Sequence, residues 1–156
     1  MENRMRCVPY DLDTEASFEI PESGLGKIDY DTQPPRLFRD PAAVRALEKL
    51  AAALRDEGYN LDTPRPGKAC QAFCSYLLGD RRINIMLSVH ERSKGLLQCS
   101  LETFYGQPFI YRLLRRDLLA SPQFLEVWRN FCSDIDRGLR DSLAARSVKW
   151  DRLRPY

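Results

Sequence analysis

The chain has 156 residues, 44% of them hydrophobic and 29% charged, and its formal net charge is +2 at pH 7. This length and composition suit one folded domain with a substantial hydrophobic core. The balanced charge argues against a dedicated nucleic-acid-binding protein, whose binding domain is usually strongly basic. No apolar run approaches the roughly 18 residues of a membrane span.

Two features favour a cytoplasmic location. The first residues, MENRMRCVPYDLDTE, lack the apolar stretch of a secretory signal peptide. The cysteines are odd in number, in a domain large enough to fold without disulfides, and this favours reduced thiols. They are Cys7, Cys70, Cys74, Cys99 and Cys132. The composition, rich in Leu, Ala and Arg, is compatible with a bacterial source.

Charge is distributed unevenly along the chain. Residues 1–40 carry nine acidic and five basic side chains, residues 41–105 carry seven and nine, and residues 106–156 carry six and ten. An acidic lead-in, residues 1–39, therefore precedes a basic body. Either the lead-in folds back onto the basic C-terminal half of the chain, or it recognises a basic partner.

The lead-in is punctuated by proline and glycine, so we expect one short strand around Ala16–Ile20 and otherwise irregular structure. Residues 40–156 are expected to form a single α+β domain. Asp40 as N-cap, Pro41 in the first turn and Gly58 at the far end signal its first helix. The apolar stripe of this helix comprises Val44, Leu47, Leu50, Ala51 and Leu54.

A β-hairpin is predicted next. The stretch INIMLSVH alternates with period two, and Gly79 and Asp80 before it suit a tight turn. This turn pairs Cys74 with Ile85, and every apolar residue of one strand then meets an apolar residue of the other. A third strand follows a turn at Ser93–Gly95, in a register predicted to pair Val89 with Leu97, Leu87 with Cys99 and Ile85 with Leu101.

The C-terminal part is predicted to be helical. A short helix is expected at Phe109–Leu119, and Ser121 with Pro122 opens a longer one of roughly 20 residues. The final SVKWDRLRPY is expected to be a tail docked by Trp150. The expected fold is therefore α+β, with a three-stranded antiparallel meander packed on one face by an N-terminal helix and C-terminal helices.

The residues that could carry chemistry do not come together in this layout. Cys70 and Cys74 would lie about 13 Å apart on one strand, at roughly 3.3 Å per residue, which is too far for one zinc ion bound by sulfur at about 2.3 Å. His90 and Glu102 form the best acid–base candidate, but the predicted register puts Glu102 near Asn84 and out of hydrogen-bond reach. We therefore predict no metal, no cofactor and no catalytic residue.

The densest basic cluster is RLLRR at 112–116, where Arg112, Arg115 and Arg116 would share one helix face. The simplest interpretation is a solvated helix face. A contact with nucleic acid or another acidic partner is the weaker alternative, because Asp117 and the modest net charge count against strong phosphate binding.

The domain resembles, at class level, the immunity proteins of bacterial toxin–immunity pairs. These are small cytosolic proteins, often α+β, that neutralise a toxin by covering its active site or a site beside it. The resemblance spans roughly residues 40–145 and rests on the meander, its flanking helices and the missing catalytic residues; the meander is CQAFCSYLLGDRRINIMLSVHERSKGLLQCSLETF. No family signature matches, so no functional residue is carried over.

The resemblance implies a non-enzymatic module that binds a cognate toxin or effector. Hydropathy argues against a membrane partner and the balanced charge argues against nucleic acid, while a homo-oligomer stays open. The binding surface of this module would be the polar face of the meander together with the acidic lead-in. The predicted contact residues are Phe73, Ser75, Asn84, Met86, Ser88, His90, Gln98, Glu102, Asp11, Asp13 and Glu15. The alternative is a small enzyme or ligand-binding domain with its site near His90 and Glu102.

Overall fold

The computed structural model of the chain describes residues 14–21, 41–62, 71–78, 81–93, 95–104, 116 and 120–152. The described elements are, in chain order, β1 (Thr14–Glu19), α2 (Pro41–Asp56), β2 (Gln71–Leu78), β3 (Arg81–Ser93), β4 (Leu96–Phe104), α4 (Pro122–Ser142) and β5 (Arg146–Arg152). The short helix expected at Phe109–Leu119 lies outside the described residues, apart from Arg116.

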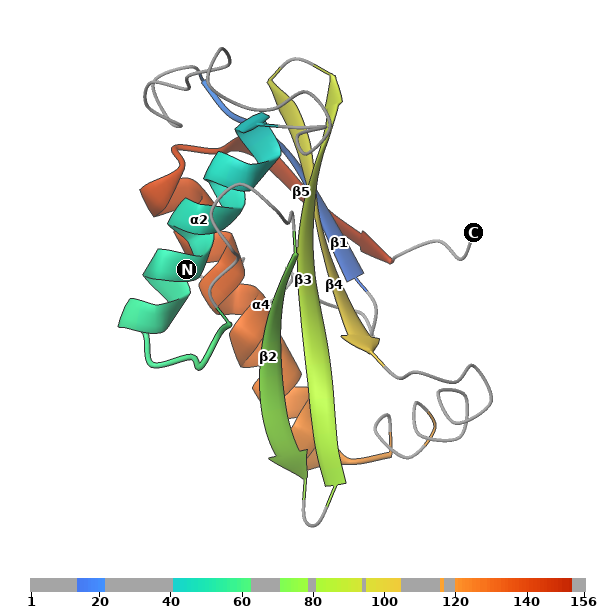
Figure 1. Cartoon of the computed structure of the whole chain (residues 1–156). Helices are drawn as coiled ribbons and strands as arrows, with labels where there is room; N and C mark the ends of the chain where they lie inside the picture. The colour runs from blue at the N-terminus through green and yellow to red at the C-terminus, as the bar shows by residue number, and fades with distance from the viewer. Residues whose placement is uncertain are drawn as a thin grey trace.

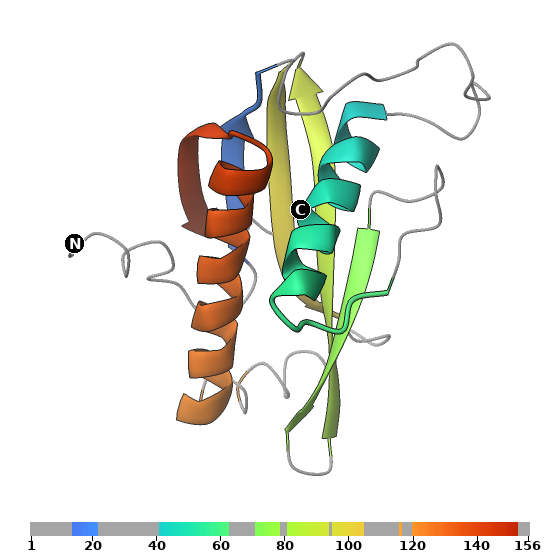
Figure 2. The ribbon, with the colours of Figure 1, turned by 90° about the vertical axis from the view of Figure 1, so that its left-hand side faces the viewer.

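One antiparallel sheet forms a single layer, with the strand order β2-β3-β4-β1-β5. Both α2 and α4 lie on the same face of this sheet and run in opposite directions (Figures 1 and 2). The α+β class is thus confirmed. The expectation of three strands is wrong, because β1 and β5 extend the meander on its β4 side.

β1 comes from the acidic lead-in and lies inside the sheet, between β4 and β5. Its residues alternate between buried and partly exposed, with Ala16 and Phe18 on the core side. The short strand expected around Ala16–Ile20 is therefore present, shifted slightly toward the N-terminus. The expected C-terminal tail is instead β5, which pairs with β1. Trp150 of β5 docks on α4, where its indole Nε1 donates to Asp136 Oδ1 at 3.0 Å.

Helix α2 ends where the sequence indicated. Gly58 has a φ of 100°, a left-handed conformation that glycine adopts without steric cost. The Gly58 N–H donates to the Arg55 carbonyl at 2.9 Å, and the Tyr59 N–H donates to the Leu54 carbonyl at 3.1 Å. This pair of hydrogen bonds is the Schellman motif, which satisfies carbonyl groups that the helix itself leaves unpaired.

Helix α4 begins as the sequence predicted. Ser121 is the N-cap, its hydroxyl oxygen accepts from the Phe124 N–H at 3.4 Å, and Pro122 occupies the first turn. Such a cap contributes about 1 kcal/mol to helix stability. The helix runs for 21 residues, and its apolar stripe faces the sheet. The buried stripe comprises Phe124, Trp128, Phe131, Cys132, Ile135, Gly138 and Leu139.

The hairpin of β2 and β3 has the predicted register, with Cys74 opposite Ile85. The register between β3 and β4 differs from the prediction by two residues, since Val89 lies opposite Cys99 rather than Leu97. The reason is that β3 continues to Ser93 and turns later than expected. A shift of two residues leaves each side chain on its predicted face and changes only its neighbours.

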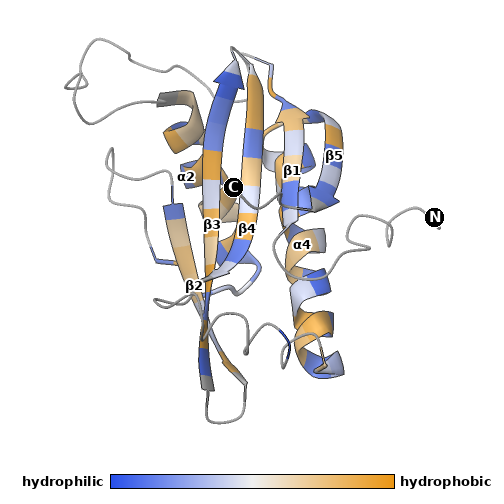
Figure 3. Ribbon diagram, turned by 90° about the vertical axis from the view of Figure 1, so that its right-hand side faces the viewer, coloured by the Kyte–Doolittle hydropathy of each residue, from blue (hydrophilic) through white to orange (hydrophobic). Residues whose placement is uncertain are grey.

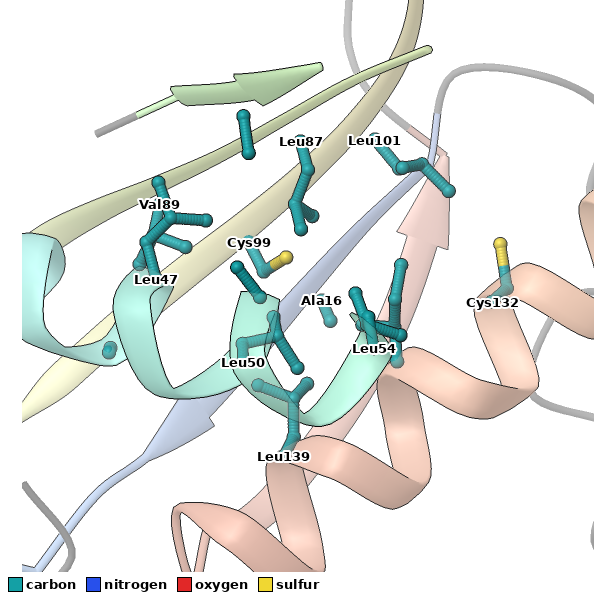
Figure 4. Close-up of a cluster of buried hydrophobic side chains, with 14 of the residues drawn as sticks. Ala16, Leu47, Leu50, Leu54, Leu87, Val89, Cys99, Leu101, Cys132 and Leu139 are labelled. Carbon is teal, nitrogen blue, oxygen red and sulfur yellow. The ribbon is translucent and has the colours of Figure 1, made fainter. Parts of the chain in front are cut away.

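The core lies between the sheet and the two helices. Leu47, Leu50 and Leu54 of α2 are fully buried against apolar residues of β3 and β4. Figure 4 shows Leu50 close to Ala16 and Leu139, where both helices meet the sheet.

Gly138 allows α2 and α4 to approach each other closely. A Cβ atom added at this position would lie 2.9 Å from Leu50 Cδ1, which is shorter than a normal van der Waals contact between carbon atoms. The glycine inside this helix therefore has a packing reason that outweighs its low helix propensity.

We expect Gly138→Val to lower the free energy of unfolding by about 1–3 kcal/mol, because the new side chain overpacks the helix contact. Chemical denaturation measures this change. Ser133→Val on the exposed face of α4 is the matched control and should cost about 0.5 kcal/mol or less. Combining Gly138→Val with Leu50→Ala should lower the free energy of unfolding by less than the sum of the two single changes, because the shortened side chain at position 50 leaves room for the new valine. Equal stability of Gly138→Val and the unsubstituted chain would contradict the close approach.

Candidate functional site

We define the outer face as the side of the sheet turned away from α2 and α4 (Figure 3). Because side chains alternate along a strand, every described residue that was predicted from the sequence to bind a partner lies on the outer face. These residues are Phe73 and Ser75 of β2, Asn84, Met86, Ser88 and His90 of β3, Gln98 and Glu102 of β4, and Glu15 of β1. Asp11 and Asp13 lie outside the described residues.

An apolar patch occupies the β2 side of the outer face. Phe73 lies directly opposite Met86, and both side chains are half-buried. Leu77 is 63% exposed, the one large hydrophobic side chain of the described residues that is so open to solvent. Sequence reasoning missed Leu77, although its spacing of two and four from Ser75 and Phe73 places it on the same face.

Polar side chains continue the row of Phe73 and Met86 toward β4. Glu102 of β4 lies opposite Met86 of β3, which in turn lies opposite Phe73 of β2. A carboxylate therefore lies next to the apolar pair. Beside them, the Ser75 hydroxyl lies 2.9 Å from Asn84 Oδ1 and donates a hydrogen bond to it. The apolar patch is therefore bordered by hydrogen-bonding groups on neighbouring strands.

The middle of the outer face is less open than the sequence suggested. Ser88 and Ser100 lie opposite each other and are only 3% and 5% exposed, and Gln98 is 7% exposed. Their burial is a correction to the expectation that these side chains are freely accessible. Both ends of the Gln98 amide are hydrogen-bonded.

These hydrogen bonds form a polar chain across three strands. The Arg92 guanidinium of β3 donates to Gln98 Oε1, and Gln98 Nε2 donates to the Glu15 carboxylate of β1. The amide thus connects a cation with an anion and has a fixed orientation. The predicted register could not reveal this chain, because it paired Gln98 with Ser88, whereas the structure places Gln98 opposite His90.

The structure separates the two residues of the acid–base candidate. His90 is exposed and lies opposite Gln98, while Glu102 lies opposite Met86, four residues away along β3. Four residues of strand correspond to about 13 Å, beyond direct hydrogen bonding or a single bridging water. Glu102 was expected near Asn84, so its neighbour is corrected, but its distance from His90 remains too large.

The cysteines that the structure describes lie in the core rather than in a site. Cys74, Cys99 and Cys132 are buried. Burial raises the pKa of the Cys99 thiol to about 12 and also raises that of Cys74, where nearby Asp62 adds to the effect. A raised pKa disfavours the reactive thiolate at neutral pH. Cys70 lies outside the described residues.

No group of three or more potential metal ligands occurs among the described His, Cys, Asp and Glu side chains. Arg112 and Arg115 of the basic cluster lie outside the described residues, and Arg116 is exposed. None of the helices in the described part of the chain is long and apolar enough to cross a membrane.

Comparisons of the chain with protein-family models, with curated proteins and with solved structures found no match. The outer face therefore has to be interpreted from its own chemistry.

A second polar cluster lies on the helix side and holds α2 to α4. The Tyr59 hydroxyl donates to Asp134 Oδ2 at 2.5 Å, and its ring packs on Phe131 with centroids 4.6 Å apart. Arg137 contacts both Asp134 and Glu57. Burial, followed by the hydrogen bond to Asp134, raises the pKa of Tyr59 above its ordinary value of 10.0. The cluster is structural, because each polar group already has a protein partner.

The raised pKa of Tyr59 predicts how stability depends on pH. Below pH 10 the Tyr59 phenol is neutral in both the folded and the unfolded chain, and its contribution to the free energy of unfolding is fully present. Above pH 10 the unfolded chain ionises first, so this contribution is lost as the pH rises toward the folded-state pKa. Denaturation from pH 8 to 11 should show the unsubstituted chain losing more stability than Tyr59→Phe.

Asp134→Asn is the matched variant for this cluster. It should reduce the pH-dependent loss without abolishing it, because burial remains the larger cause of the pKa shift. Identical slopes above pH 10 for the unsubstituted chain and Tyr59→Phe would show that Tyr59 titrates normally in the folded protein.

Proposed function

We propose that this chain is a non-enzymatic protein-binding module, an inhibitor of the kind found in bacterial toxin–immunity pairs, that covers its partner with the outer face. The observation that carries the proposal is the composition of that face. An apolar patch of Phe73, Met86 and Leu77 is surrounded by polar groups on adjacent strands. A partly apolar centre with a hydrogen-bonding rim is the usual anatomy of a protein–protein interface.

The acidic residues that precede β1 favour a basic partner surface. The described part of the outer face is balanced in charge: its carboxylates belong to Glu15, Glu19, Glu102 and Asp151, and its cationic groups belong to Arg82, Arg92, Arg146 and Lys149. Arg92 is bound to Gln98. Asp11 and Asp13 immediately precede β1 in the sequence and add further negative charge. Such charge speeds the encounter with an oppositely charged partner.

Rigidity supports the same proposal. The outer face is built on strands, and the polar chain of Arg92, Gln98 and Glu15 fixes three neighbouring strands relative to one another. A surface that is ordered before binding loses less conformational entropy when its partner arrives. Inhibition would then need no chemistry, only tight occupation of the toxin surface.

The size of the outer face indicates that other segments take part. Four strand spacings of about 4.8 Å and six residue steps of about 3.3 Å give a projected area of roughly 400 Å² for the whole outer face, and its buried middle offers a partner little of this area. A standard interface buries about 800 Å² on each partner. The acidic residues before β1 are the natural supplement, because the chain enters the sheet next to Glu15.

The test uses the protein encoded by the neighbouring gene as the candidate toxin, purified in an inactive form for binding and expressed in active form for protection. We expect a 1:1 complex and survival of cells that express both proteins. Met86→Arg should weaken binding by roughly 30-fold or more, because it places a charge at the centre of the apolar patch. Glu102→Gln should mainly slow association and reduce its salt dependence.

Asn130→Arg on the exposed face of α4 is the matched control and should leave binding and protection unchanged. Circular dichroism would establish that Met86→Arg folds like the control. The proposal fails if a folded Met86→Arg variant binds and protects as well as the unsubstituted chain, or if the purified toxin does not bind.

A further inference from the structure

β5 is an edge strand attached through a very short hinge. Leu143, Ala144 and Ala145 connect the end of α4 to the start of β5. Ala144 has a φ of 51°, in the left-handed region that is unfavourable for a residue with a Cβ atom. Helices that end in this conformation usually place glycine there. The turn back onto β1 is therefore made at a strained residue.

The pairing of β5 with β1 is also irregular. The register shifts between Ser17 and Glu19, and Ser147 within β5 has a φ of 54°. Most β5 side chains are exposed, with Val148 and Trp150 partly buried against the core. The strand thus contributes little buried surface of its own.

β1 nevertheless requires a neighbour on this side. Thr14, Ala16 and Phe18 are buried, and removal of β5 would leave β1 as an unpaired sheet edge, which is prone to pair with another strand. The contacts that hold β5 are specific: Trp150 Nε1 donates to Asp136, and Thr14 Oγ1 donates to the Asp151 carbonyl at 2.9 Å. A β5 from another copy of the chain would reproduce both contacts.

We propose that two copies of this chain exchange β5, each inserting it beside β1 of the other. A short hinge under strain favours such an exchange, since extending the hinge releases the strain while all native contacts are kept. The occupant of the β1 edge is then a second copy rather than an unrelated strand. This inference is independent of the proposed toxin partner, because α2, β2, β3 and β4 are unchanged by the exchange.

The first experiment varies the hinge in the full-length chain. Deletion of Ala144 should prevent β5 from folding back and give dimers in size-exclusion chromatography with light scattering. Insertion of three glycines after Ala144 should give monomers. Ala144→Gly should lower the association constant of the dimer roughly tenfold or more, because it removes the hinge strain from each of the two monomers.

The second experiment does not depend on the deletion variant folding. The unsubstituted chain, refolded at about 1 mM, should give a dimer that persists on dilution, whereas refolding at about 1 µM should give monomer. Ser17 and Lys149 lie opposite each other across β1 and β5. Ser17→Cys and Lys149→Cys chains, refolded together at the higher concentration and oxidised, should therefore form a disulfide between chains, which neither variant forms alone.

Each outcome decides the proposal. A dimer without this disulfide would mean that another surface associates, and would overturn the exchange. A chain that remains monomeric at about 1 mM, with its hinge intact and with Ala144 deleted, would overturn it as well.

Discussion

The fold depends on the burial of one face of β3 and β4. Ile83, Ile85, Leu87 and Val89 alternate along β3 and are buried in the core between the sheet and the helices. At roughly 25 cal/mol per Å² of apolar surface, this burial is the main stabilising contribution. The same alternation turns every second side chain away from the helices. The outer face is thus a direct consequence of how the core is built, and its residues can vary in chemistry without loss of core packing.

Two polar arrangements hold the surrounding elements in place, on opposite sides of the sheet. On the helix side, Tyr59 and Asp134 connect the end of α2 to α4. On the outer face, Gln98 connects Arg92 to Glu15 and so ties β3, β4 and β1 together. Buried polar groups are tolerated where they are hydrogen-bonded, and an amide bonded at both ends favours one strand arrangement over others. The proposed binding surface is therefore a preorganised part of the fold.

The two ends of the described chain meet in the sheet. β1 and β5 are separated by more than a hundred residues and form neighbouring strands, with Thr14 bonded to the Asp151 carbonyl. Closing so long a loop costs conformational entropy, which the burial of β1 offsets. This contact is the least regular part of the sheet, and the strain at Ala144 lies beside it. The stable centre and the exchangeable edge thus have different physical origins.

The sequence by itself determined the elements whose signals are local. Short-range periodicity and turn chemistry predict the C-terminal end of α2 and the N-cap of α4. They also predict the hairpin of β2 and β3, the face of each strand residue, and the burial of Cys74 and Cys99. Only the tertiary structure decided which strands extend the sheet beyond β4. Long-range pairing determines where β1 and β5 lie, how β4 is aligned with β3 and which groups Gln98 bonds. The alignment of β4 could not be read from the sequence, because a register shift of two residues preserves the hydrophobic pattern.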